Sequence, residues 1–281
     1  MVDCHIHMVL DGHYWKSAIA RHSDKVDINW VAGVLKCYRE AGFTYLRDCG
    51  DRWGVGKMAR EMAKDYGITY RTPLASLYKR GHYGGIIGKP FETMGEFASL
   101  VRQNKAEGAD FIKIMISGLM NFDQFGRLTE DGLEEAEIKE LIHISHEEGM
   151  AVSVHGNGAK NVLAAAEVGV DSVEHGAYLQ EETLCAMQEA GTVWVPTLST
   201  IGNLRGKGRF SEAAVQAILE SAMENVSRFA QLGGLVAPGT DAGAWQVPHG
   251  IKTEFALLRQ ALGEETDALL EKGAAVIQKR F

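Results

Sequence analysis

Histidine, lysine and aspartate residues stand where they could together bind metal ions. His5 and His7 lie two residues apart in the run Val2–Met8, so a strand would direct both imidazoles to one face. Lys113 interrupts the otherwise apolar run Phe111–Met115, and burying an unpaired ammonium group is costly. Lys113 must therefore pair with a carboxylate or carry a modified amine, such as the carbamate formed with CO₂.

Three further residues of this kind stand at the ends of β-rich runs. His155 and His175 are the last residues of two such runs, and Asp241 directly follows a third. Neutral imidazole and carboxylate groups suit zinc and other first-row divalent ions. The HxH pair alone fits ordinary strand histidines equally well, but the whole set favours a metal site.

The elements that must position these residues alternate along the chain. The predicted strands are Val2–Met8, Thr44–Cys49, Thr69–Ala75, Asp110–Ser117, Ala151–His155, Asp171–His175, Thr192–Pro196 and Gly234–Thr240. The predicted helices are Trp30–Ala41, Val55–Tyr66, Thr93–Ala106, Glu134–Glu148, Ala159–Val168, Glu181–Ala190, Ser211–Leu232, Lys252–Leu262 and Glu265–Arg280. Eight strands alternating with helices in 281 residues predict an α/β fold, a single-domain (β/α)8 TIM barrel over residues 1–281.

In such a barrel the active site lies at the carboxyl ends of the strands, where His155, His175 and Asp241 fall. Strand alternation predicts two faces for the first strand. Asp3, His5 and His7 should point into the barrel, and the apolar face meeting the helices should carry Val2, Cys4, Ile6 and Met8.

Composition argues against several classes of partner. Lys plus Arg is 29 and Asp plus Glu is 37, and the net charge of −8 opposes binding to nucleic acid or to anionic membranes. The four cysteines lie far apart without a CxxC pair, which indicates reduced thiols and a cytoplasmic location. No apolar run reaches the roughly 18 residues of a membrane span. We expect a small-molecule substrate.

Several segments resemble the amidohydrolase superfamily. Its pattern is HxH on strand one, lysine on strand four, histidine on strands five and six, and aspartate on strand eight. The segments that carry the likeness are Phe111–Gly118, Val154–Gly158, Val173–Gly176, Val195–Leu198 and Gly239–Gly243. They look like the subgroup that includes imidazolonepropionase-like enzymes and Xaa-Pro or Xaa-Arg dipeptidases.

The resemblance implies a metal-dependent hydrolase of amide-type C–N bonds in dipeptides, N-acyl amino acids or cyclic amides. It implies two divalent ions, zinc first, with manganese, iron or cobalt as alternatives. The implied ligands are His5, His7 and Asp241 for one ion, His155 and His175 for the other, and a carboxylated Lys113 bridging both. A metal-bound hydroxide would attack the carbonyl, and Asp241 would pass the proton to the leaving amine. In mononuclear members, Lys113 would stay unmodified.

The sequence departs from this family at both ends of the barrel. Such enzymes usually carry a small β-sandwich built from segments before and after the barrel. Here Met1 stands directly before the first predicted strand, and one helical stretch follows Leu262. We therefore expect no sandwich, and something else must close the bottom of the barrel. A homo-oligomer is one hypothesis.

Substrate contacts are predicted in two loops. His82 and Tyr83 lie in the glycine-rich segment Gly81–Gly85 after the third strand, and His249 follows Asp241 in the last loop. A flexible turn is the competing interpretation of the first segment. Two other functions stay open: a lactonase or phosphotriesterase-like hydrolase with the same residues, and a barrel that binds metal without catalysis.

Overall fold

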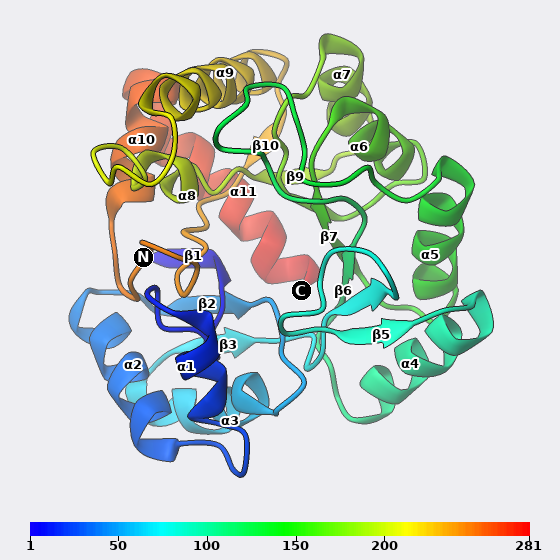
Figure 1. The fold of residues 1–281 in the computed structure, drawn as a ribbon, viewed down its shortest axis with the longest axis vertical. Coiled ribbons are helices and arrows are strands. Elements are labelled where there is room, and N and C mark those ends of the chain that lie inside the picture. The colour runs from blue at the N-terminus through cyan, green and yellow to red at the C-terminus, as the bar shows by residue number, and fades with distance from the viewer.

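The predicted β-rich runs form parallel strands that surround a common axis (Figure 1). The computed structural model describes residues 1–281. Its strands are β1 (Val2–Ile6), β2 (Tyr45–Asp48), β3 (Thr69–Arg71), β4 (Leu77–Lys79), β5 (Lys89–Phe91), β6 (Ile112–Met115), β7 (Val152–Gly156), β8 (Ser172–His175), β9 (Val193–Val195) and β10 (Leu235–Val236). They form two parallel ladders, with the orders β1-β2-β3 and β10-β9-β8-β7-β6-β4-β5.

Backbone hydrogen bonds join the two ladders into a barrel. After β10 the chain runs beside β1, where the Cys4 N–H donates to the Pro238 carbonyl over 2.8 Å. On the other side, β3 and β4 follow one another and share the third barrel position. There the Asp110 N–H donates to the Thr72 carbonyl over 3.0 Å. The predicted (β/α)8 fold is confirmed, with β5 as an additional strand that pairs only with β4.

Helices surround the ring of strands, and α11 lies behind it (Figure 1). They are α1 (Trp15–Ala20), α2 (Ile28–Glu40), α3 (Val55–Ala63), α4 (Met94–Ala106), α5 (Glu135–Glu147), α6 (Ala159–Ala166), α7 (Glu181–Glu189), α8 (Ser199–Gly202), α9 (Glu212–Gln231), α10 (Thr253–Leu262) and α11 (Thr266–Arg280), with short 3-10 turns at Lys64–Tyr66 and Gly263–Glu265. The sequence predicted loops where α1, α8, β4 and β5 lie. These elements have six residues or fewer, too few to show a hydrophobic period.

The β6 strand shows how alternation positions a chemical group. Ile112, Ile114 and Ile116 are fully buried in the main apolar core together with helix residues such as Leu141. Lys113 lies between them in sequence, so its side chain points to the other face of the strand, into the barrel. The same alternation directs His155 of β7 inward.

The alternation predicted for β1 is partly wrong. A register irregularity between Asp3 and Ile6 interrupts the pairing with β2. Ile6 packs in the cluster next to α2, as predicted, but Cys4 packs with Tyr45 and other residues at the bottom of the barrel. The Asp3 carboxylate accepts hydrogen bonds from the Thr240 N–H and hydroxyl. One extra residue in the ladder shifts the facing of those before it.

Helix α11 crosses behind the strands in Figure 1 and covers the bottom of the barrel. Its residue Ile277 and the terminal Phe281 belong to a buried cluster with Cys4 and Phe111, and the rings of Phe111 and Phe281 are 5.1 Å apart. The end of the barrel that we expected another element to close is thus covered by the chain's own helix. The homo-oligomer stays a prediction.

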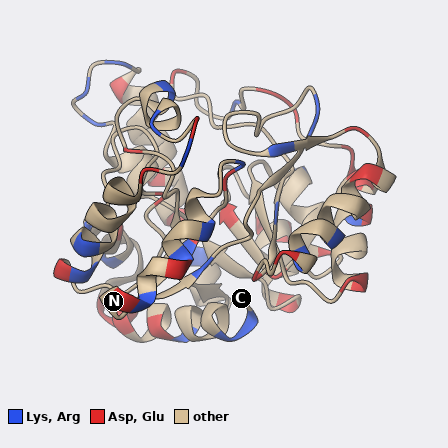
Figure 2. Cartoon of the chain, turned by 90° about the horizontal axis from the view of Figure 1, so that it is seen from below, with Lys and Arg blue, Asp and Glu red and all other residues tan.

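The outer surface mixes charges of both signs, with Lys and Arg interspersed among Asp and Glu on the helices (Figure 2). Both termini lie toward the lower edge of that view. All four cysteines are free thiols, as expected. None of the helices combines the length and the apolar character needed to cross a membrane.

Candidate metal centre

The six predicted metal ligands line one cavity of about 550 Å³. They come from β1, β6, β7 and β8 and from the segments that follow β1 and β10: His5, His7, Lys113, His155, His175 and Asp241. Lys113 is the second residue of β6, and the other five lie near or beyond the carboxyl ends of their strands. The barrel therefore brings together residues up to 236 positions apart, since Asp241 reaches back to His5.

Asp241 lies between the two histidines of the HxH pair. Its Oδ1 is 3.1 Å from His7 Nε2 and 3.3 Å from His5 Nε2. His5 Nε2 and Asp241 Oδ1 are buried atoms without a hydrogen-bond partner of good geometry. Buried polar atoms without a hydrogen-bond partner are rare in protein interiors, unless another group such as a bound ion satisfies them. The three atoms converge as ligands around one point would.

His175 approaches the same point from β8. One candidate ligand atom from each of His5, His175 and Asp241 lies within 4.8 Å of the others. His175 Nδ1 lies 2.7 Å from the Thr197 hydroxyl, which leaves Nε2 directed elsewhere. His175 and Asp241 both have positive φ angles, 70° and 57°. Such strained backbone in non-glycine residues is common at functional sites.

His155 lies beside His175, with ring centroids 4.5 Å apart. Its Nε2 is 3.2 Å from the Gly118 carbonyl oxygen, so Nδ1 is the nitrogen left for a ligand. Burial, and then the charge of Lys113, lowers the pKa of His155 to about 3. Burial also lowers the pKa of His7 and of His175. These imidazoles are therefore neutral, the form that binds metals.

Lys113 is buried without an ion pair. The nearest hydrogen-bond partner of its Nζ is the Ser153 hydroxyl, at 3.5 Å. Burial lowers its pKa, which favours the neutral amine. From the sequence we expected a carboxylate partner or a modified amine, and no carboxylate lies within ion-pair distance of Lys113 in the structure. A neutral, buried amine is the reactive form for carbamate formation.

A buried hydrogen-bond network, which we did not predict from the sequence, contacts His5 at Nδ1. The Glu174 carboxylate lies 2.6 Å from His5 Nδ1 and 2.6 Å from the Arg47 guanidinium. It also accepts hydrogen bonds from the hydroxyls of Ser153 and Ser172. Burial opposes its charge, but Arg47 holds the pKa of Glu174 well below the usual range. The only sequence signal was a glutamate directly preceding His175.

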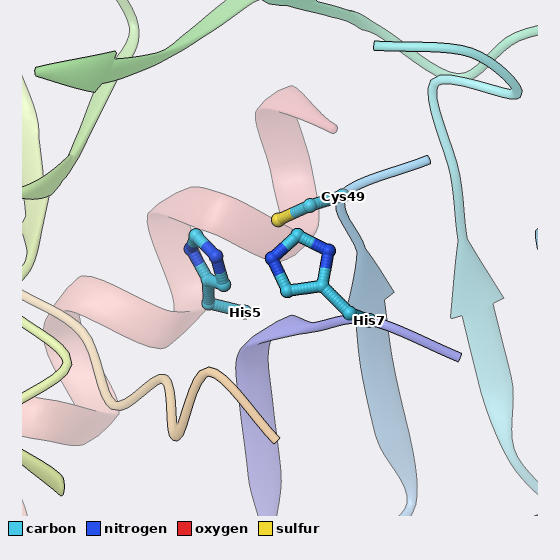
Figure 3. Close-up of side chains that lie close together, drawn as sticks. All are labelled: His5, His7 and Cys49. Atoms are coloured by element: carbon cyan, nitrogen blue, oxygen red, sulfur yellow. The ribbon is translucent and has the colours of Figure 1, made fainter. Parts of the chain in front are cut away.

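Cys49, predicted only as a reduced thiol, also lies at this centre. It follows β2, and Figure 3 shows its sulfur directed toward the imidazoles of His5 and His7. One ligand atom from each of the three residues lies within 4.8 Å of the others. Its place at the carboxyl end of a barrel strand was the available signal.

The donor set fits divalent transition metals. The neutral imidazoles of His7, His155 and His175 and an ionised carboxylate are borderline ligands that suit zinc and its neighbours. Burial opposes a charge on His5, but Cys49 and Asp241 raise its pKa well above the usual value, so this imidazole would lose a proton on binding a metal. Burial opposes ionisation of Asp241, but His5 and His7 hold its pKa well below the usual range. The carboxylate-to-imidazole contact at His5 Nδ1 is typical of metal-ligating histidines, whose second nitrogen is held by another group. The unpartnered buried atoms point to the same conclusion.

Of the three residues predicted to contact substrate, one lines the cavity and two do not. Tyr83 lines the cavity, with its ring 4.7 Å from that of His155. His82 does not line it and lies 3.8 Å from the Glu130 carboxylate at the rim. His249 is also outside the lining, because its Nε2 bonds the Leu10 carbonyl and its Nδ1 bonds the Tyr38 hydroxyl. The structure thus gives His249 a packing role between loops.

Comparison with known proteins places this architecture in a family. The model of the amidohydrolase family matches residues 1–273. Ochratoxinase of Aspergillus niger is 26% identical over 294 residues, covering 92% of this chain and 60% of its own. An uncharacterized protein of Mycobacterium tuberculosis is 24% identical over 277 residues, covering 92% of this chain and 68% of its own. This chain thus spans about 60% of the length of the curated ochratoxinase.

The fold is shared with solved structures. The structure of a Xaa-Pro dipeptidase with bound methionine superposes on this chain with a TM-score of 0.78 and 22% sequence identity. The superposition covers 99% of this chain and 75% of the dipeptidase chain.

Proposed function

Because this chain belongs to the amidohydrolase family, we propose that it is a metal-dependent hydrolase of amide-type C–N bonds. The proposed substrates are dipeptides, N-acyl amino acids or cyclic amides. The observation that carries the proposal is the group of unpartnered, buried ligand atoms around His5 and Asp241 at the floor of a large cavity. The match to the amidohydrolase family and the structural similarity to a Xaa-Pro dipeptidase support it.

We propose that His5, His7 and Asp241 hold one divalent ion, and that His155 and His175 hold a second. Lys113, as a carbamate, would connect the two. Zinc is the proposed metal. Ions bound there would lower the pKa of water and polarise the substrate carbonyl.

The chain's own groups have separate tasks in this reaction. Asp241 is ionised and buried, so its carboxylate accepts the proton of the attacking water and passes it to the leaving nitrogen. Glu174 keeps a proton on His5 Nδ1 and thereby leaves Nε2 free. Tyr83 lines the cavity beside His155 and is the proposed contact for a bound amide.

The test combines metal content with turnover. Protein purified without chelator should contain about two first-row metal ions per chain, and Lys113→Gln should contain about one. Release of free amine from a panel of dipeptides, N-acyl amino acids and hydantoins should require the metal. Asp241→Asn should reduce turnover at least about a thousandfold, because proton transfer and a ligand charge are both lost.

Glu254→Gln is the matched control, since Glu254 is a buried acid outside the cavity. It should keep both metal and turnover. Protein without metal, and unable to take up zinc or manganese, would overturn the proposal in favour of a barrel without this chemistry. If the protein hydrolyses lactones or phosphotriesters and cleaves no amide, the proposed substrate class would be wrong. The protein would then be a lactonase or a phosphotriesterase-like hydrolase.

A further inference from the structure

The cavity carries a charge arrangement that the metal centre does not explain. Apart from Lys113, Arg209 is the only lysine or arginine in its lining, and Asp241 is the only acid. Asp241 belongs to the metal centre. The outer part of the cavity therefore offers a cation and no anion to a bound molecule.

The Arg209 guanidinium lies over two aromatic rings. Its central carbon lies 4.3 Å from the centre of the Trp245 ring and 5.1 Å from that of Phe210. The Phe210 ring contacts those of Trp245, at 6.0 Å, and Phe122, at 5.3 Å. Three loops, those after β6, α8 and β10, thus meet in one aromatic cluster with Arg209 on its surface.

Arg209 makes no ion pair and no side-chain hydrogen bond within the protein. The acid next to Phe122, Asp123, instead accepts a hydrogen bond from the Ser211 N–H at the start of α9. An arginine that packs over aromatic rings can keep the N–H edge of its guanidinium available for hydrogen bonds. That edge forms paired hydrogen bonds with a planar carboxylate.

Arg205 and Lys207, exposed on the same loop, are also without ion pairs. Neither side chain lines the cavity, in contrast to Arg209. Apolar side chains make up half of the 28 lining residues. An anionic molecule with a large apolar or aromatic group matches both features.

We propose that Arg209, with Trp245 and Phe210, forms a subsite for the carboxylate of a substrate that also carries a large apolar or aromatic group. This inference rests on the proposed function, because it selects among the amides that the metal centre could cleave. It favours N-acyl amino acids and dipeptides with bulky apolar side chains over neutral cyclic amides.

The binding test uses two probes without an amide bond, 3-phenylpropionate and 3-phenylpropan-1-ol, titrated calorimetrically into the metal-loaded protein. The native protein should bind the acid at least about tenfold more tightly than the alcohol. Arg209→Gln should lose that preference. Arg209→Lys should keep only part of it, because lysine keeps the charge but lacks the fork and the stacking face. Arg205→Gln is the control and should bind as the native protein does.

Equal binding of the acid by the native protein and Arg209→Gln would overturn the proposal, since the carboxylate would then bind elsewhere, such as at the metal. The absence of any preference for the acid would also overturn it. Neither probe can be hydrolysed as an amide, so these outcomes leave the proposed reaction untouched. Conversely, Arg209-dependent binding without any amide turnover would reject the reaction and keep the subsite.

Discussion

At the scale of single residues, the environment of His5 decides which of its nitrogens can act. Nδ1 faces the Glu174 carboxylate at 2.6 Å, and an ionised carboxylate can only accept a hydrogen bond. The proton of a neutral His5 must then stay on Nδ1, and Nε2 carries the free lone pair toward Asp241. Arg47 keeps Glu174 ionised inside the protein.

Glu174→Gln should weaken metal binding about 10- to 100-fold, as measured by competition with a chelator. The new amide can donate to His5 Nδ1 and so favours the tautomer whose Nε2 is protonated. Glu254→Gln is the control for replacing a buried glutamate, and thermal unfolding of both variants checks that they are folded. Unchanged metal affinity in Glu174→Gln would contradict this role.

At the scale of elements, helix α11 depends on a close approach to β10. A Cβ at Gly273 would lie 2.0 Å from the Val236 carbonyl oxygen, which belongs to the backbone and has little room to move. Only glycine allows the helix to lie this close to the bottom of the barrel. Leu270 and Ile277 on the same helix are buried there.

Gly273→Ala should therefore lower the free energy of unfolding by about 1–3 kcal/mol, measured by urea denaturation, because the helix must shift away from the strand. Gly33→Ala in α2 is the matched control. No atom lies within 4 Å of the added carbon there, and the exchange should stabilise the helix by about 0.5–1 kcal/mol. An unchanged free energy of unfolding in Gly273→Ala would mean that the stability of the barrel does not depend on the close approach of α11 to β10.

At the scale of the whole molecule, stability should depend on pH through buried carboxyl groups. Glu254 of α10 accepts hydrogen bonds from the Ser199 N–H and hydroxyl of α8. Burial nevertheless raises its pKa from 4.5 to about 8. Burial also raises the pKa of Asp3, of Asp48 and of Asp51 to about 6. For all four groups the folded state binds protons more tightly than the unfolded state.

The contribution of Glu254 to stability should therefore be lost as pH rises from about 4.5 to about 8, because the unfolded chain ionises Glu254 and the folded chain does not. The contribution is at most about 1.4 kcal/mol per pH unit. The buried histidines His7, His155 and His175, whose pKa values are lowered, act in the opposite direction. Urea denaturation at several pH values should show a shallower decline for Glu254→Gln than for the native protein. Equal slopes in the two proteins would assign the pH dependence to other groups.

The sequence by itself determined the barrel, the family and the approximate place of the candidate metal centre. Hydrophobic periods and strand ends are local properties, and a closed parallel barrel brings every strand's carboxyl end to one face. Lys113 stood out because a charge among isoleucines has few structural explanations. The resemblance to amidohydrolases is confirmed by the match over residues 1–273. The cytoplasmic location stays a prediction.

Only the tertiary structure decided which side chains meet across the barrel and above it. Glu174 contacts His5, and Arg209 lies over Trp245, although no periodicity relates these residues in the sequence. The irregular register of β1 is likewise visible only in its pairing with β2. His249 shows the reverse case: its loop reaches the cavity side of the barrel, but packing against Tyr38 turns the ring away. Such contacts depend on how distant loops fill the space that the closed barrel leaves, and local sequence patterns do not encode that geometry.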